Sequence, residues 1–113
     1  MYVIVADKLS CTSNTGDYSQ AVSMEGANAV LLTLLVHTKS ASTTVDASLE
    51  GSNDLQNWSN SGLTGSTSLT ATTIGFAAPL KVTGIAYRYI RVKFTVSPST
   101  VAIVSSDVNT ASL

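Results

Sequence analysis

The sequence contains a single cysteine, Cys11, and a single histidine, His37. One cysteine cannot form an intramolecular disulfide, so the hydrophobic core alone must hold the fold together. A zinc site needs three or four His and Cys ligands, and this chain supplies two. A catalytic dyad would need the thiol and the imidazole to meet in a polar site, whereas His37 lies in an apolar run. We therefore expect no zinc centre, no cofactor and no enzymatic activity.

Charge is equally scarce, because charged residues make up only 12% of the chain and the formal net charge is -1. Proteins that bind nucleic acid concentrate Lys and Arg, so nucleic acid is not an expected partner. Neutral hydroxyls take the place of charges, with 17 Ser and 15 Thr among 113 residues. A weakly charged surface of this kind favours adhesion between proteins.

Long apolar runs are missing as well. No stretch approaches the roughly 18 residues that a transmembrane helix needs, and residues 1–7 lack the basic segment and cleavage site of a signal peptide. We expect no membrane partner and synthesis in the cytoplasm. The length and the 44% hydrophobic content predict one folded domain over residues 1–113.

Alternation of apolar and polar residues, the pattern of a strand with one buried face, is clearest in Thr43–Glu50 and Tyr87–Val96. The inward positions expected from it are Val45, Ala47, Leu49, Ile90, Val92, Phe94 and Val96. The short turn Ser97–Ser99 then predicts an antiparallel hairpin with Thr100–Val108, in which Val101 and Ile103 share the core.

The segment Ala29–His37 is apolar on both faces and shows no polar stripe at helical spacing. This composition predicts a central strand that is covered on both sides. Its first face holds Val30, Leu32, Leu34 and Val36. Its second face, with Leu31, Leu35 and His37, is our candidate interface with another subunit.

Weaker strand patterns occur at Tyr2–Ala6, Tyr18–Met24 and Ser66–Phe76. Together with the stronger segments they give seven to eight short strands and no convincing helix. The fold expected is therefore all-β, an antiparallel β-sandwich of jelly-roll type.

Two motifs carry a resemblance to known families: Leu49–Ser59 resembles an "SNDGxNW" signature, and Ala86–Val92 resembles the "aRYIRv" strand that follows it. Their order and spacing are similar to the second half of discoidin-type (F5/8 C) jelly rolls, and the same pairing is similar to small β-sandwich proteins of tailed bacteriophage virions. The first resemblance implies glycan binding and the second implies a structural role in the virion.

The motif residues also have simpler interpretations. Asn53 and Asp54 can form turns with their own backbone, and Trp58 can cap the core while its indole N–H reaches a loop carbonyl. Four residues of this region, Asp46, Glu50, Asn53 and Asp54, could instead supply oxygens to a calcium ion. The one basic cluster, Arg88, Arg91 and Lys93, could bind an anion, although cross-strand pairing with a carboxylate is the simpler expectation.

Two hypotheses follow. The first is a capsid decoration or cement protein of a bacteriophage virion, a structural protein that assembles as a homo-oligomer and binds other virion proteins such as the major capsid protein; a tail or adaptor component is a variant of it. The second is a carbohydrate-binding module, whose expected ligand platform is Trp58, Asn53, Asp54, Tyr89 and Arg91.

Overall fold

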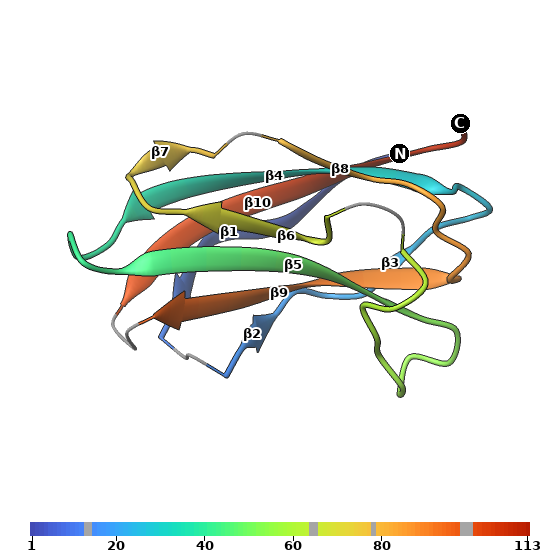
Figure 1. Cartoon of the computed structure of the whole chain (residues 1–113), viewed down its shortest axis with the longest axis horizontal. Coiled ribbons are helices and arrows are strands. Elements are labelled where there is room, and N and C mark those ends of the chain that lie inside the picture. Colours follow the sequence, from blue (N-terminus) through green and yellow to red (C-terminus); the bar gives the residue numbers. More distant parts are fainter. Residues whose placement is uncertain (13–14, 64–65, 78, 98–100) are drawn as a thin grey trace.

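The computed structural model describes residues 1–12, 15–63, 66–77, 79–97 and 101–113. Over these residues the chain forms strands and no helix (Figure 1). The strands are β1 (Tyr2–Cys11), β2 (Asp17–Tyr18), β3 (Val22–Ser23), β4 (Ala29–Thr38), β5 (Thr44–Ser52), β6 (Ser68–Ala71), β7 (Gly75–Phe76), β8 (Leu80–Val82), β9 (Tyr89–Ser97) and β10 (Ala102–Ala111). The predicted all-β antiparallel sandwich is confirmed.

The ten strands described exceed the seven to eight expected, for three local reasons. The expected strand Tyr18–Met24 pairs only at its two ends, as β2 and β3, and Ser66–Phe76 is divided into β6 and β7. In addition, β8 forms in a segment for which no strand was expected.

Strand pairing is nested along the chain. β1 pairs with β10, β2 and β3 pair with β9, β4 pairs with β7 and β8, and β5 pairs with β6. These pairs are arranged in two sheets. Sheet A has the order β1-β10-β4, and β7 and β8 pair with the other edge of β4. Sheet B has the order β9-β5-β6, and β2 and β3 pair with the other edge of β9. Nested pairing across two sheets is a jelly-roll arrangement.

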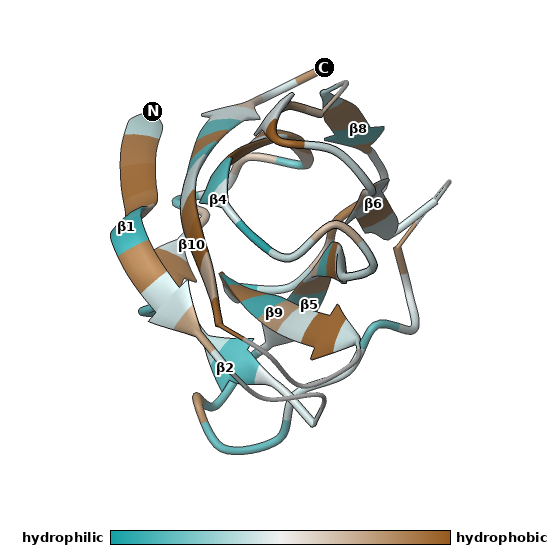
Figure 2. Cartoon of the chain, turned by 90° about the vertical axis from the view of Figure 1, so that its left-hand side faces the viewer, coloured by the Kyte–Doolittle hydropathy of each residue, from teal (hydrophilic) through white to brown (hydrophobic). Residues whose placement is uncertain are grey.

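The core lies between the two sheets and follows the alternation of the sequence. All seven inward positions expected in β5 and β9 are fully buried, and Val30, Leu32, Leu34 and Val36 of β4 are at most 1% exposed. Hydrophobic and hydrophilic bands alternate along β9 and β10 in Figure 2. Residues two apart share a face of a strand, so one pattern builds each layer of the core.

The predicted hairpin between β9 and β10 is wrong. β9 pairs with β5, β2 and β3 in sheet B, whereas β10 lies between β1 and β4 in sheet A. The chain therefore crosses from one sheet to the other after Ser97; the turn residues 98–100 lie outside the described residues.

The predicted core positions in β10 are also wrong by one residue. Val101 is 55% exposed and Ile103 is half-buried, while Ala102, Val104 and Val108 are buried. A slip of one residue moves every side chain of a strand to the opposite face. Ser106, on the buried face, donates a hydrogen bond of 2.6 Å to the backbone carbonyl of Thr33, which removes the cost of burying its hydroxyl.

Ala29–His37 was expected to be a central strand that is covered on both sides. Its central position is confirmed, and one of its two faces is covered. β4 is a central strand of sheet A. Its second face is not covered by the described part of the chain, because Leu31 is 42% exposed and His37 is exposed too.

Candidate functional site

The outer face of sheet B is polar and internally paired. Arg91 donates from Nε to the Glu50 carboxylate at 2.8 Å across the β5–β9 pair. Thr70 of β6 donates its hydroxyl to Asp46 of β5. The cross-strand pairing expected for Arg91 is thus confirmed, and these contacts join polar side chains of neighbouring strands across the outer face of sheet B.

The outer face of sheet A is different, because large apolar side chains project from it into solvent. Leu35 of β4 lies opposite Phe76 of β7, and Phe76 is 76% exposed. Side chains from β1 and from the segment after β10 extend the same surface. We name this surface the apolar face and define it by Tyr2, Ile4, Leu31, Leu35, Phe76 and Leu113. Contiguous exposed apolar patches on a folded protein mark interaction sites.

A polar cluster lies in the middle of the apolar face. The carboxylate of Asp107 accepts hydrogen bonds from the hydroxyl of Thr33 at 2.6 Å and from the phenol of Tyr2 at 3.0 Å. The hydrogen bond to Asp107 raises the pKa of Tyr2, since the carboxylate favours the protonated phenol. The three strands β1, β10 and β4 are therefore joined on their outer side, and the carboxylate already has partners.

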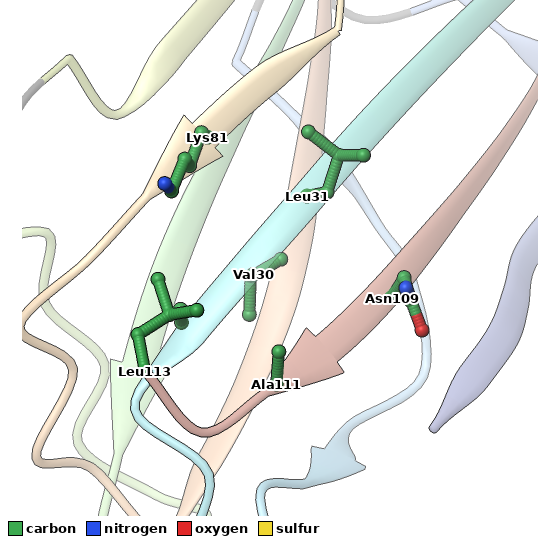
Figure 3. Close-up of a pocket in the computed structure, with 7 residues that line it drawn as sticks. Val30, Leu31, Lys81, Asn109, Ala111 and Leu113 are labelled. Atoms are coloured by element: carbon green, nitrogen blue, oxygen red, sulfur yellow. The ribbon is translucent and has the colours of Figure 1, made fainter.

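A groove of about 180 Å³ crosses one end of the apolar face (Figure 3). Leu31 lies on β4 at its centre, Lys81 of β8 lies on one side, and Asn109 and Ala111 of β10 lie on the other. The backbone of Leu113 is held there because its N–H and its carbonyl both hydrogen-bond to the side chain of Asn28. The groove is lined almost entirely by carbon.

The structure places the three predicted interface residues, Leu31, Leu35 and His37, along the outer side of β4. Leu31 and Leu35 belong to the apolar face, while His37 lies at its margin, with Nε2 2.8 Å from the Ser105 hydroxyl. That Phe76 would join them could not be predicted from the sequence. Its segment is rich in Thr and Ser, and only the β4–β7 register brings Phe76 beside Leu35.

The predicted ligand platform lies at the other site of interest, the loop after β5. Asp54 organises this loop: its carboxylate accepts from the backbone N–H groups of Gln56 and Asn57 at 2.9 and 2.8 Å, and from the Asn57 side-chain amide at 2.7 Å. The Ser52 hydroxyl donates to it as well, at 3.0 Å. The turn role expected for Asp54 is confirmed.

These hydrogen bonds, that of the Asn57 backbone first, hold the pKa of Asp54 well below its ordinary value. The ionised Asp54 carboxylate thus stabilises the turn fully at any pH above the pKa of an ordinary Asp. This stabilisation is lost as the pH falls from the ordinary Asp pKa through the lowered pKa of Asp54. We expect the Gln56 and Asn57 amide resonances to keep their positions as the pH is lowered through about 3.9, the midpoint of an ordinary Asp. A pH titration followed by NMR measures this, and a midpoint at the ordinary value would contradict it.

Aromatic rings surround this loop. The guanidinium of Arg91 lies over the rings of Tyr18 and Trp58, at 3.9 and 4.3 Å from their centroids. Tyr87 covers Gly51 and donates its hydroxyl to the Ser61 carbonyl at 2.7 Å. Within the described residues, no hydrogen bond from the Trp58 indole to a loop carbonyl is found.

Gly51 is required by the ring of Tyr87. A Cβ at position 51 would overlap Cδ2 of that ring, which would force the ring or the strand to move. We expect Gly51→Ala to destabilise the protein by about 1 to 3 kcal/mol through overpacking, as measured by denaturant unfolding. In a double-mutant cycle, the same substitution in a Tyr87→Ala background should cost much less. Equal costs in both backgrounds would show that the ring is not the obstacle.

The remaining platform residues are divided between two hollows. Asn53 lies beside Asp54 and Trp58, and its Oδ1 accepts from the backbone N–H of Arg88 at 3.0 Å. Tyr89 lines a neighbouring hollow together with Arg88. Arg91 lines neither of these two hollows, because it is enclosed between Glu50 and the two rings. The two sequence motifs nevertheless meet in space, since β5 and β9 are neighbours in sheet B.

The groups considered for metal or thiol chemistry lie apart. Cys11 is buried in the core. This burial, and to a smaller extent the negative charge of Asp17, raises the pKa of the Cys11 thiol to about 11. His37 lies on the outside of sheet A. Among residues 1–12, 15–63, 66–77, 79–97 and 101–113, no three His, Cys, Asp or Glu side chains form a group that could hold a metal ion. The same residues include no helix long and apolar enough to cross a membrane.

Together these features define an antiparallel jelly-roll sandwich with one polar and one apolar outer face. The family model Bbp16 matches residues 5–108, which include both motifs and three residues of the apolar face, Leu31, Leu35 and Phe76. The chain therefore belongs to the Bbp16 family, a family of bacteriophage proteins. No curated protein matches the chain.

Proposed function

We propose that this chain is a non-enzymatic structural protein of a phage virion, a decoration subunit that is made in the host cytoplasm and binds the capsid shell as a homo-oligomer. The observation that carries the proposal is the apolar face of sheet A. Membership of a phage family gives the biological setting, and the apolar face gives the means of attachment.

The contrast between the two outer faces supports this proposal. Sheet B exposes paired charges and hydroxyls, so little is gained by removing it from water. Sheet A exposes Phe76, Leu31 and Tyr2, whose burial against a partner is favourable at about 25 cal/mol per Å² of apolar area. A symmetric shell repeats each contact many times, so a modest contact per subunit is sufficient.

Binding to purified shells tests the proposal. The protein is mixed with shells assembled from the major capsid protein of the same phage, and co-sedimentation is measured beside light scattering of the protein alone. We expect saturable binding and an oligomer in solution. A strict monomer at high concentration that does not sediment with shells would refute the proposal.

Immunogold labelling of intact virions separates the decoration role from that of a tail or adaptor component. Label over the whole head supports decoration, whereas label confined to the neck or tail assigns the other role.

A further inference from the structure

Sheet A has one long strand edge that the described part of the chain leaves open. β1 is the outermost strand of this sheet, and within the described ranges no strand pairs with its second edge (Figure 2). The other outermost strands, β2, β3, β6, β7 and β8, have two to four residues each, whereas β1 has ten. Short edge strands are one means by which proteins prevent pairing with other chains, and β1 lacks this protection.

The first residues of β1 direct backbone groups toward the open edge. Met1 and Thr110 form a hydrogen-bonded pair, because the Met1 ammonium donates to the Thr110 carbonyl at 2.9 Å and the Thr110 N–H donates to the Met1 carbonyl at 2.8 Å. Bonded and non-bonded pairs alternate along an antiparallel ladder. In the register of β1 with β10, Tyr2 and Ile4 therefore occupy non-bonded positions. Their N–H and carbonyl groups point away from β10.

Irregularities in β1 limit how much of this edge another strand can use. The register with β10 shifts at two places after Ile4, and Lys8 has a φ of 51°, in the left-handed region. Bulges twist an edge away from an incoming strand, and charged residues such as Asp7 and Lys8 hinder its pairing. Regular pairing is therefore confined to Tyr2–Ile4, a segment without charge.

The side chains of this segment belong to the apolar face. Tyr2 and Ile4 are 60% and 57% exposed, and both line a hollow of about 180 Å³ that Leu35 and Phe76 line as well. Residues two apart share a face of a strand, so a strand added to β1 would place every second side chain on the apolar face. The open edge and the apolar face thus form one continuous surface.

The length of the usable edge decides between two occupants. Three residues span about 10 Å of strand. Two copies of this chain joined by that edge alone would bury far less than the area of about 800 Å² per partner that is usual in a stable dimer. An extended segment of the shell protein would meet the edge as part of a larger contact, because in the proposed function the shell covers the apolar face.

From this geometry we infer that the open edge of β1 at Tyr2–Ile4 binds an extended segment of the shell protein as an additional strand of sheet A. The inference rests on the proposed attachment of the apolar face to the shell, and it names the kind of segment that is bound. The added strand exchanges backbone hydrogen bonds with Tyr2 and Ile4, which supply affinity. Its alternate side chains are apolar and pack on the apolar face, which supplies specificity.

Ile4→Pro is the test variant. Proline removes the N–H that faces the open edge, and an edge strand tolerates proline where its N–H faces solvent. In the complex the substitution leaves a carbonyl of the added strand without its donor, so we expect the affinity for purified shells to fall about thirtyfold. Co-sedimentation over a range of concentrations measures this loss. The circular dichroism spectrum and the oligomeric state should be unchanged.

Two further variants separate the backbone from other effects of proline. Ile4→Val trims the side chain and keeps the N–H, so it should weaken binding by no more than about fourfold. Ser68→Pro is the matched control on sheet B. Because Leu49 donates its N–H to the Thr67 carbonyl, the same alternation directs the backbone of Ser68, an exposed residue, toward the open edge of β6. This variant should bind shells as the unsubstituted protein does.

Hydrogen exchange measures the same contact without a substitution. The full chain, free and bound to shells, is exchanged in deuterated buffer, and peptides from its first residues and from β6 are analysed by mass spectrometry. We expect the Ile4 amide to exchange at least about tenfold more slowly on the shell. The Ser68 amide should keep its rate. If Ile4→Pro does not fold, this measurement decides alone.

Three results would overturn the inference while the proposed function stands: shell binding by Ile4→Pro equal to that of the unsubstituted protein, equal losses for Ile4→Pro and for either Ile4→Val or Ser68→Pro, and an Ile4 amide that gains no protection on shells. A smaller oligomer of Ile4→Pro with normal shell binding would also overturn it, because a second copy would then occupy the edge. If the unsubstituted protein does not bind shells, the proposed function fails and the inference fails with it.

Discussion

Replacing Phe94 with alanine is expected to destabilise the fold by about 3 to 5 kcal/mol. Phe94 is among the largest of the fully buried side chains, and it lies on β9, the central strand that joins β5 to β2 and β3. The loss combines the transfer of the ring to water with the cavity that remains. Because total stabilities of small domains are of the same order, the variant should be largely unfolded or poorly expressed. Denaturant unfolding of any soluble fraction measures the effect.

Thr95→Ala is the control for this prediction, one residue further along the same strand. Thr95 points outward and is only half-buried, so its removal should cost less than about 1 kcal/mol. Similar losses at both positions would contradict the register of β9. The comparison therefore tests the core and the strand alternation together.

Replacing Leu35 with glutamate is expected to abolish assembly while the subunit stays folded. Leu35 is on the outer side of β4, opposite Phe76, so the new carboxylate can remain hydrated in an isolated subunit. At a subunit boundary the same carboxylate would be buried without a partner, which costs several kcal/mol. We expect the variant to have a normal circular dichroism spectrum, to elute as a monomer on size exclusion and to fail to sediment with shells.

Ser48→Glu is the matched control, because it places the same charge on the outer face of sheet B, opposite Lys93. It should assemble as the unsubstituted protein does. A Leu35→Glu protein that assembles normally would show that the apolar face is not the contact, and an unfolded one would show that Leu35 supports the subunit itself.

The alternating strands could be read from the sequence, and their pairing could not. Alternation over Val45–Leu49 and Ile90–Val96 reports directly on burial, because residues two apart share a face. It contains no information about which strand lies alongside. A short connection favours a hairpin in general, but here β10 continues into sheet A, where β1 and β4 bind it on both edges.

The error in β10 comes from the start of the strand, where Val101 and Ile103 are more hydrophobic than Ala102. Further along, the same face carries the polar Ser105 and Asp107, whereas the buried face carries Val104 and Val108. The buried face also accommodates Ser106, because its hydroxyl donates to the backbone carbonyl of Thr33. A buried hydroxyl with a hydrogen bond costs little, and this partner is visible only in three dimensions.

In the candidate sites too, contacts between residues close in sequence could be predicted, and contacts between distant segments could not. Asp54 and Trp58 are turn and aromatic residues close together in sequence, so their proximity could be predicted. The contacts of Gly51 with Tyr87 and of Leu35 with Phe76 each join segments far apart in the chain. Such pairs depend on the order of strands in a sheet, which no local pattern encodes.

The nested pairing of the strands has a consequence for the timing of folding during translation. β1 emerges from the ribosome well before β10, its partner in sheet A, and the N–H of Thr110 bonds to the carbonyl of Met1. The edges of β1 and β4 that β10 will occupy thus stay open throughout synthesis. Contacts so distant in sequence fold slowly, and open strand edges invite pairing with other chains. Until β10 has been made and closes sheet A, a nascent chain of this protein therefore exposes two strand edges that can pair with other chains.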